Sequence, residues 1–349
     1  MSILLGELMK NLFIFMFLLL NGITTAFSAQ KVMPAPLLRL DQYFSHHVLV
    51  AEKSTHQLHI FKNNNGFPEL LKTYKVVTGK KSGDKFFQGD HRTPEGIFHF
   101  TQFIPHEELV SKYGKEGEIY GVGAFVMNYP NPMDKKFKKT GYGIWLHSTN
   151  DETRIEKGLD SRGCIVAANN ELKEISTYLE LNKTPIIVVQ DLIYLKEKTW
   201  QSAKSTLEET VESWRNAWEN EDFDKYISHY HKTDFFDRYR GNYQNFRIYK
   251  RAVFSNPGKP QVNLDNISIF QNSRYAVVTF KQHYISNTIN DTGKKTLYLK
   301  KDQWYQWKIV NETWNKLKEN ITDTIAFEPT MRFFKENQAE STTTAAKSN

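Results

Sequence analysis

Cys164 is the only cysteine among the 349 residues, and it ends the run Ser161-Arg162-Gly163-Cys164. A single cysteine cannot close an internal disulfide, so it is a buried apolar residue, an intermolecular partner or a reactive thiol. His147 lies 17 positions earlier, at the end of the apolar run Ile144-Trp145-Leu146. A histidine delivered by a short strand and a cysteine in a later turn have the residue types of a general base and a nucleophile.

The neighbours of Cys164 favour a reactive thiol. Gly163 lets the backbone adopt a turn and approach a reacting group closely, and Arg162 adds positive charge that would favour the thiolate. Ser161 can form local hydrogen bonds, and we expect its hydroxyl or carbonyl to orient the His147 imidazole. The opposing interpretation is that free cysteines are commonly buried and pack as small hydrophobes. Spacing alone does not decide between the two.

The N-terminus has the layout of a secretory signal. Lys10 precedes an uninterrupted apolar run at residues 12–20, and a stretch of small residues follows at 24–29. Cleavage after Ser28 would make residues 1–28 a signal peptide, with an uncleaved anchor as the alternative. Because an unpaired thiol is a liability in an oxidising compartment, export favours a functional role for the solitary cysteine.

A second motif runs from Gly89 to Phe98 with the sequence Gly-Asp-His-Arg-Thr-Pro-Glu-Gly-Ile-Phe. Pro94 and Gly96 punctuate it, and the apolar residues at its end indicate a turn that enters a strand. This local interpretation needs no function to explain it.

Together these segments resemble the L,D-transpeptidase (YkuD) family of bacterial cell-wall enzymes. The family signature is a His followed, after an interval, by Ser/Thr-His-Gly-Cys, and His147, Ser161, Gly163 and Cys164 match it position by position. The resemblance implies that these four residues form the catalytic site, with Cys164 as nucleophile and His147 as base. The family also has a Gly-Asp-x-x-Thr-Pro-x-Gly-x-Phe motif, which residues 89–98 match in the same order.

Two departures from the family pattern concern the substrate. Arg162 stands where family members usually have His, and Val166 stands where many have an Arg thought to meet the substrate carboxylate. We therefore expect Arg162 to bind that carboxylate, with an outward-pointing, solvated arginine as the alternative. Residues 124–130 resemble the family strand that borders the cleft, which makes Asn128 and Tyr129 the other candidate substrate-binding residues.

The elements that must position these residues belong to a mainly β domain. Strand-like alternation runs from Val48 to Gly79, residues 170–181 have helical spacing, and residues 184–189 supply a closing strand. By the resemblance, residues 40–195 form an L,D-transpeptidase-like catalytic domain with a β-sandwich-like fold.

A second domain is predicted for residues 201–330. Leu207, Val211, Trp214 and Trp218 form one apolar helical stripe, and strand alternation with turns rich in Asn, Gly and Asp dominates from Val262 onward. Helices followed by an antiparallel sheet indicate an α+β domain, and the order of elements resembles the nuclear transport factor 2-like (NTF2-like) fold. We expect this domain to position substrate rather than to supply chemistry. The tail, residues 337–349, is predicted to be disordered.

Composition excludes some classes of function. The net charge of +7 suits polyanionic surroundings such as wall polymers or lipid headgroups, but no dense Lys/Arg block indicates nucleic-acid binding. His56 and His59 are predicted to point to opposite sides of a strand, and no His-Glu-x-x-His cluster occurs, so neither a metal site nor a zinc hydrolase is expected. No cofactor is expected, and no stable membrane span after signal removal; the oligomeric state stays open.

The resemblance implies a peptidoglycan-modifying enzyme in the periplasm of a Gram-negative bacterium. The Cys164 thiolate attacks the L,D peptide bond before the terminal D-alanine of a tetrapeptide stem, D-alanine leaves, and a thioester remains. An amine acceptor makes the enzyme an L,D-transpeptidase, which the catalytic motif favours. Water makes it an L,D-carboxypeptidase, as in the similar two-domain enzymes that shape curved and helical cells. The alternative of another class is a non-catalytic wall-binding protein, although such a scaffold would need neither Cys164 nor His147.

Overall fold

The computed structural model describes residues 31–255, 258–317 and 327–334. The predicted signal peptide (1–28) and the predicted disordered tail (337–349) lie outside these ranges. Within the described ranges, no helix is both long and apolar enough to span a membrane. The described residues from Met33 onward fall in one compact unit.

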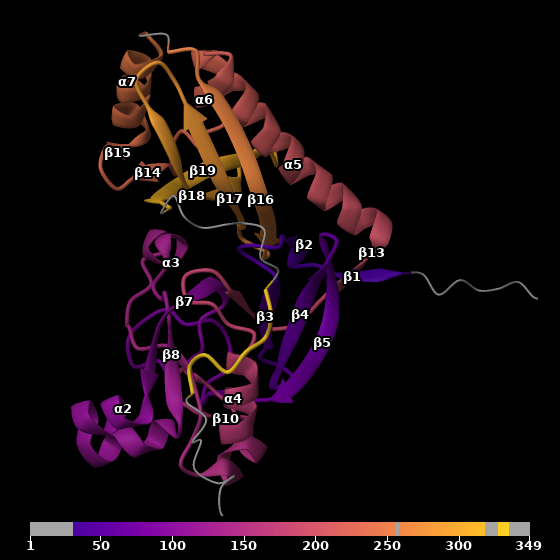
Figure 1. Ribbon diagram of the computed structural model, residues 1–349, viewed down its shortest axis with the longest axis vertical. Coiled ribbons are helices and arrows are strands. Elements are labelled where there is room, and N and C mark those ends of the chain that lie inside the picture. Colours follow the sequence, from indigo (N-terminus) through magenta and orange to yellow (C-terminus); the bar gives the residue numbers. More distant parts are fainter. Residues whose placement is uncertain (1–30, 256–257, 318–326, 335–349) are drawn as a thin grey trace, which may run out of the picture. The chain divides into compact units, whose positions relative to one another are not determined.

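An eight-stranded sheet forms the frame of the first domain (Figure 1). Its strands lie in the order β11-β9-β8-β7-β12-β3-β4-β5. Their bounds are β3 His47–Glu52, β4 Gln57–Asn64, β5 Phe67–Lys75, β7 Gly96–Pro105, β8 Gly123–Met127, β9 Trp145–His147, β11 Ile165–Val166 and β12 Pro185–Val189. The predicted closing strand, β12, lies in the middle of the sheet, parallel to β3 and antiparallel to β7.

Burial explains the sequence pattern of this domain. β12 is a continuous apolar run, with Ile186 and Ile187 fully buried, because it has a neighbour on each side and both of its faces are covered. The helix predicted for residues 170–181 is present as α4 (Asn169–Ser176), and it packs Leu172 and Ile175 into the core. The sheet and α4 thus fix the positions of the loops around Cys164.

Several short elements surround the nucleophile. β6 (Thr78–Gly79) pairs in parallel with β10 (Leu159–Ser161). Between β7 and β8 the chain forms two helices that were not predicted, α2 (His106–Tyr113) and the 3-10 helix η1 (Gly114–Tyr120). The remaining short helices are α3 (Pro132–Lys136) and η2 (Glu152–Lys157).

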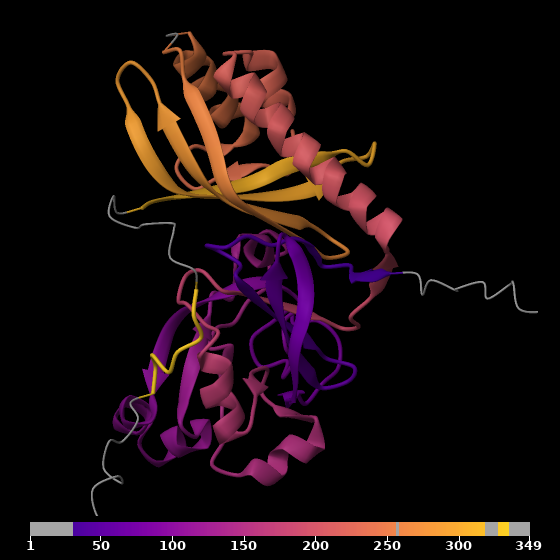
Figure 2. The same ribbon diagram turned by 45° about the vertical axis from the view of Figure 1, so that its right-hand side comes forward.

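The second sheet has five strands in the order β19-β18-β17-β16-β2. Its four consecutive strands are β16 Gln261–Gln271, β17 Ala276–Ile285, β18 Asn290–Lys301 and β19 Trp307–Lys316. Figure 2 shows the long helix α5 (Glu197–Glu219) running across this sheet, with α6 (Phe223–Ser228) and α7 (Tyr243–Phe254) beyond it. The smaller strands are β1 Val32–Pro34, β13 Tyr194–Lys196, β14 Phe236–Asp237 and β15 Gly241–Asn242. As predicted, helices come first, and Leu207, Val211 and Trp214 are buried against the sheet.

The fifth strand, β2 (Leu37–Arg39), comes from the chain ahead of the catalytic domain. It pairs antiparallel with β16, where Arg39 lies opposite Ile269. Leu38 belongs to the core of the second domain, and the carbonyl of Leu37 accepts a hydrogen bond from Trp200 Nε1 at 2.9 Å. The second domain is therefore assembled from two segments of the chain, one on each side of the first domain.

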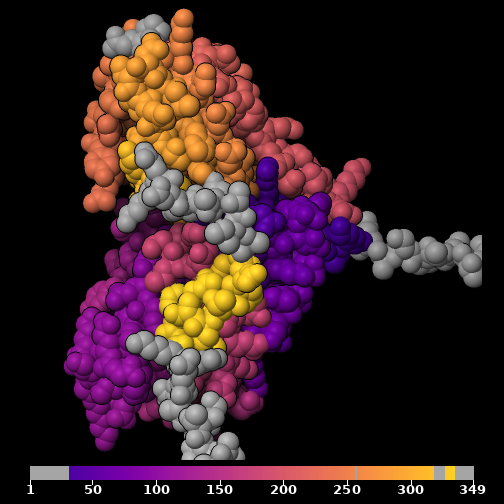
Figure 3. Space-filling model, viewed as in Figure 1, coloured from indigo at the N-terminus to yellow at the C-terminus, as the bar shows by residue number. Residues whose placement is uncertain are grey.

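Residues 327–334 return to the first domain after the last strand. Phe327 stacks on His46 with ring centroids 3.6 Å apart, and Phe333 and Phe334 pack against Phe103 at 5.3 and 5.1 Å. Figure 3 shows this segment in yellow on the surface of the first domain. The segment that follows the last strand therefore contributes to the surroundings of β7 and β8.

Candidate active site

Two short parallel strands carry Cys164 and His147. β11 pairs with β9 in a register that places Ile165 opposite Leu146 and Val166 opposite His147. Cys164 comes directly before β11, so it lies next to Trp145, whose backbone N–H faces the thiol. The Cys164 Sγ atom lies 3.5 Å from the carbonyl oxygen of Gly143. Two residues 17 positions apart in the sequence thus lie on one strand pair, two register positions apart.

A hydrogen bond orients the imidazole of His147 through one ring nitrogen and leaves the other without a partner among the described residues. His147 is buried, and its Nδ1 lies 2.5 Å from the carbonyl oxygen of Ser148. Because a carbonyl can only accept, Nδ1 carries the proton and Nε2 is left unprotonated, the state that a general base requires. The expectation that Ser161 orients this ring is wrong; the carbonyl of Ser148 does so.

Ser161 instead shapes the nucleophile turn. Its hydroxyl donates to the carbonyl oxygen of Cys164 at 2.7 Å and accepts from the N–H of Gly163 at 3.0 Å. Gly163 has φ +124°, and a Cβ atom there would lie 2.7 Å from the carbonyl oxygen of Arg92. Only glycine fits this conformation and this contact without strain.

The second sequence motif forms the support for that turn. Asp90 accepts hydrogen bonds from the N–H groups of Phe86 and Arg92 and from the buried Lys85 Nζ at 2.7 Å. Thr93 Oγ1 accepts from the N–H of Gly79 at 2.9 Å. Since β6 pairs with β10, these contacts fasten the motif loop to the strand that leads into the nucleophile turn.

The resting pair is a neutral thiol beside a neutral imidazole. Burial raises the pKa of Cys164 to about 11, against the opposing effects of the Trp145 N–H and the charges of Lys85 and Arg154. Burial also lowers the pKa of His147 to about 4, although its hydrogen bond to Ser148 opposes this shift. Proton transfer from sulfur to Nε2 must therefore accompany attack on a substrate.

Arg162 does not have the electrostatic role predicted for it. Its side chain is exposed, and the cations that lower the pKa of Cys164 are Lys85 and Arg154. No sequence motif marks Lys85, because its effect on the pKa of Cys164 depends on how the loop folds. Binding of a substrate carboxylate by Arg162 stays a prediction.

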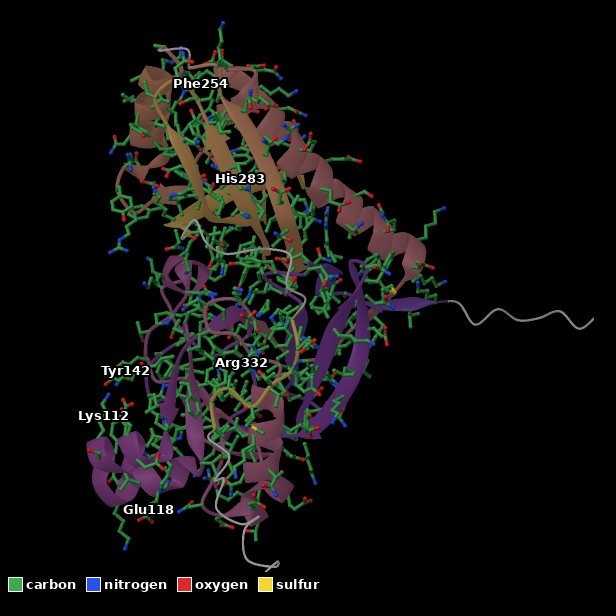
Figure 4. The ribbon with its side chains drawn as sticks, in the orientation of Figure 1. Lys112, Glu118, Tyr142, Phe254, His283 and Arg332 are labelled. Carbon is green, nitrogen blue, oxygen red and sulfur yellow. The ribbon has the colours of Figure 1, made fainter. Side chains whose placement is uncertain are left out.

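Tyr120 is a further site residue, which no sequence motif marks. Its ring lies 5.0 Å from the His147 ring in an edge-on arrangement and 4.9 Å from Trp145. Burial and the neighbouring Cys164 raise the pKa of its hydroxyl. Tyr120 ends η1, so the α2–η1 segment, on which Figure 4 labels Lys112 and Glu118, covers one side of the catalytic pair.

Asn128 and Tyr129 make contacts within the fold. The Asn128 Oδ1 atom accepts from the N–H of His99 at 2.9 Å. Tyr129 is 6% exposed, and its hydroxyl donates to the carbonyl oxygen of Thr140 at 3.0 Å. The structure does not bring either side chain to Cys164, so substrate binding by these residues stays a prediction.

Cavities and ligand clusters do not alter this assignment. A cavity of about 1290 Å³ adjoins the α2–η1 segment, but neither Cys164 nor His147 lines it. Its lining includes Phe103, His106, Gly121, Asn169, Phe333 and Phe334. Within residues 31–255, 258–317 and 327–334, no group of three or more His, Cys, Asp or Glu side chains is arranged to hold a metal ion.

Comparisons with known proteins agree with this architecture. The profile of the L,D-transpeptidase catalytic domain (YkuD) matches residues 46–188, and that of the Cds6 C-terminal NTF2-like domain matches residues 206–313. The structure of Bd1075 from Bdellovibrio bacteriovorus is similar at 32% identity and a TM-score of 0.72, covering 83% of this chain and 100% of that one. The helical cell shape determining protein Pgp2 from Campylobacter jejuni is similar at 25% identity and a TM-score of 0.63, covering 80% and 95%. No curated protein gave a significant match.

The fold and these matches define a two-domain protein in which an L,D-transpeptidase-type domain precedes an NTF2-like domain. The chain belongs to the L,D-transpeptidase (YkuD) family. The predicted mainly β first domain and α+β second domain are thereby confirmed.

Proposed function

We propose that this protein is an exported peptidoglycan-modifying cysteine enzyme that cleaves the L,D bond before the terminal D-alanine of a tetrapeptide stem. One observation carries the proposal: within this family's fold, one pair of parallel strands carries the only cysteine and a buried histidine whose Nε2 has no hydrogen-bond partner among the described residues. A substrate in the cell wall implies a location outside the cytoplasm, and we place the protein in the periplasm.

The chemistry follows from these two side chains. His147 Nε2 removes the thiol proton as Cys164 Sγ forms a bond to the carbonyl carbon, and the carbonyl oxygen becomes an oxyanion. Because the Gly163 N–H is committed to Ser161, the Cys164 N–H is the candidate oxyanion donor, an interaction worth on the order of 3 kcal/mol. The C–N bond then breaks, His147 returns the proton to the departing D-alanine amine, and a thioester remains on Cys164.

The group that attacks the thioester determines which reaction the enzyme catalyses. Attack by an amine of a neighbouring stem gives transpeptidation, and we place it first because it is the activity for which the family is named. Attack by water gives an L,D-carboxypeptidase that trims tetrapeptides to tripeptides. This second candidate, with a role in cell shape, is supported by the likeness to the cell-shape determinant Pgp2 along both domains.

Incubation of the purified protein with muropeptides, followed by mass analysis, tests the proposal. Cross-linked dimers with loss of D-alanine indicate transpeptidation, and tripeptides indicate carboxypeptidation. Cys164→Ala should abolish either product, because no other thiol exists in the chain. Residual turnover above about a tenth of the wild-type rate in this variant would assign the nucleophile elsewhere.

A non-catalytic wall-binding protein would give a different result. Wild type and Cys164→Ala would then bind sacculi equally and leave muropeptides unchanged. Covalent labelling of Cys164 by a carbapenem, detected by the mass of the intact protein, separates an acylating site from a mere scaffold.

A further inference from the structure

Arg274 of the NTF2-like domain contacts the loop that supports the nucleophile turn. It lies in the turn between β16 and β17, outside the catalytic domain. Its Nη1 atom lies 2.6 Å from Asp84 Oδ2, and its Nη2 atom donates to the carbonyl oxygen of Glu95 at 3.0 Å. Asp84 and Glu95 bracket residues 85–94, so one guanidinium holds both ends of the loop.

We propose that Arg274 is a positioning residue through which the NTF2-like domain sets the reactivity of the Cys164 thiol. The inference deepens the proposed function, because it names a second-domain residue on which the same site depends. It changes the expectation that this domain only positions substrate.

Asp84 is the centre of the contact. Its Oδ1 atom accepts from the N–H of Glu95 at 2.8 Å and from Lys139 Nζ at 2.9 Å, and Lys139 also pairs with Asp134 at 3.1 Å. The Lys139 side chain is fully buried and Asp84 is 10% exposed. Loss of one partner from a buried charge cluster leaves an uncompensated charge, which costs far more than loss of a surface ion pair.

The loop carries this constraint to the nucleophile in two ways. Lys85, next to Asp84, pairs with Asp90 and lowers the pKa of Cys164 more than Arg154 does. The carbonyl of Arg92 lies against Gly163, closely enough to exclude any larger residue there. A displacement of the loop would therefore move a stabilising charge and the wall of the nucleophile turn together.

The turn that presents Arg274 is itself held in place. Asn272 Oδ1 accepts from the N–H groups of Arg274 and Tyr275 at 2.8 and 3.0 Å. The Tyr275 hydroxyl is buried and accepts from the N–H of Ile97, directly after the loop, at 2.9 Å. Two adjacent residues of the NTF2-like domain thus bond to Asp84, ahead of the loop, and to the backbone of Glu95 and Ile97, after it.

Arginine suits this position better than lysine. Its planar guanidinium directs separate N–H groups at Asp84 and at the Glu95 carbonyl, whereas an ammonium would keep the charge without that fixed fork. Arg274→Lys should therefore retain the ion pair and lose part of the loop's alignment.

The solitary cysteine allows a test that does not depend on muropeptide turnover. In the full-length protein, the alkylation rate of Cys164 by iodoacetamide, measured across pH, reports the ionisation of this one thiol. The variants are Arg274→Ala, Arg274→Lys and Tyr275→Phe. Arg238→Ala is the matched control, because Arg238 is an exposed arginine of the same domain and has no ion pair among the described residues.

We expect Arg274→Ala to raise the pH midpoint of alkylation by about half a unit or more, which lowers the thiolate fraction about threefold at a pH below the midpoint. Arg274→Lys should recover part of that shift, Tyr275→Phe should produce a smaller shift in the same direction, and Arg238→Ala should match wild type. With muropeptides, kcat should fall more than KM rises.

A merely structural contact would give another pattern. Arg274→Ala would then melt at a lower temperature, yet the folded protein would keep the wild-type alkylation midpoint, and this outcome overturns the inference. If Arg274→Ala does not fold, wild-type midpoints in both Arg274→Lys and Tyr275→Phe overturn it. If the wild-type protein leaves muropeptides unchanged while the alkylation shifts appear, the proposed function fails and the positioning role stands.

Discussion

The ring of Tyr120 lies edge-on to the imidazole of His147, with 5.0 Å between ring centroids and 80° between the planes. Tyr120 thereby helps to keep water from the base, and burial is the main cause of the low His147 pKa of about 4. The α2–η1 segment thus affects the proton chemistry of the pair as well as access to it.

Tyr120→Ala should move the acid limb of the pH–rate profile upward. A base works only when neutral, and exposure to water should raise the His147 pKa from about 4 toward 6.5. We expect a shift of about one to two pH units in kcat/KM for tetrapeptide. Tyr120→Phe keeps the ring and should leave the limb in place. An unchanged limb in Tyr120→Ala would remove the ring from any role in tuning His147.

Gly163→Ala should inactivate the protein and destabilise it by about 1–3 kcal/mol or more, because the added Cβ meets the Arg92 carbonyl in a backbone conformation that alanine avoids. Chemical denaturation and carbapenem labelling measure the two effects. Gly89→Ala is the control, since Gly89 has φ +82° but no atom within 4 Å of a Cβ. Gly89→Ala should show only the destabilisation that the positive φ causes. Equal labelling by Gly163→Ala and wild type would contradict the close contact.

Arg162→Lys separates the two interpretations of this exposed residue. If the guanidinium clamps a stem carboxylate, the lysine variant should raise KM for tetrapeptide several-fold, while carbapenem acylation stays as in wild type. Steady-state kinetics with Arg162→Lys and Arg162→Ala provide the measurement. Wild-type KM values in both variants would show that Arg162 is solvated and that another group meets the carboxylate.

Buried histidines should make the protein acid-labile. Burial, with the charges of His46 and Lys62, lowers the pKa of His47 to about 3. The folded state therefore disfavours the protonated ring, so the associated stability is complete above pH 6.5 and is lost as pH falls toward 3. The melting temperature should fall between about pH 7 and about pH 4.5, and His47→Gln should reduce that fall.

The control for this experiment is His283→Gln, which alters a partly exposed histidine beside Asp265. It removes a partly exposed histidine ring in place of a buried one. If His47→Gln and His283→Gln behave alike, the acid sensitivity arises elsewhere.

Sequence patterns predicted the structure correctly where a short run of residues determines a strand or a helix. The apolar triplet ahead of His147 predicts a short strand, which is present as β9 and pairs in parallel with β11, directly after Cys164. The stripe of Leu207, Val211 and Trp214 likewise predicts the helix that packs on the second sheet.

Other features depend on contacts between distant segments, which leave no periodic signal. Lys85 lowers the pKa of Cys164 from a loop in which its ammonium pairs with Asp90. Tyr120 reaches His147 through a mostly polar helical segment that lacks a strong apolar stripe. The prediction that Ser161 orients His147 was wrong. A serine hydroxyl can donate to any of several nearby acceptors, and the geometry of the turn places the Cys164 carbonyl in reach.

Strand β2 joins the two domains through strand pairing, which the order of elements in the sequence does not reveal. It precedes the catalytic domain, yet it pairs with β16, and Arg39 at its end forms an ion pair with Glu208 of α5 at 2.7 Å. A protease cut at the single later connection, between Lys196 and Glu197, would therefore not release two separable pieces. The fragments would stay joined through a completed sheet, so the catalytic domain behaves as an insertion into its partner and cannot be detached by one break in the chain.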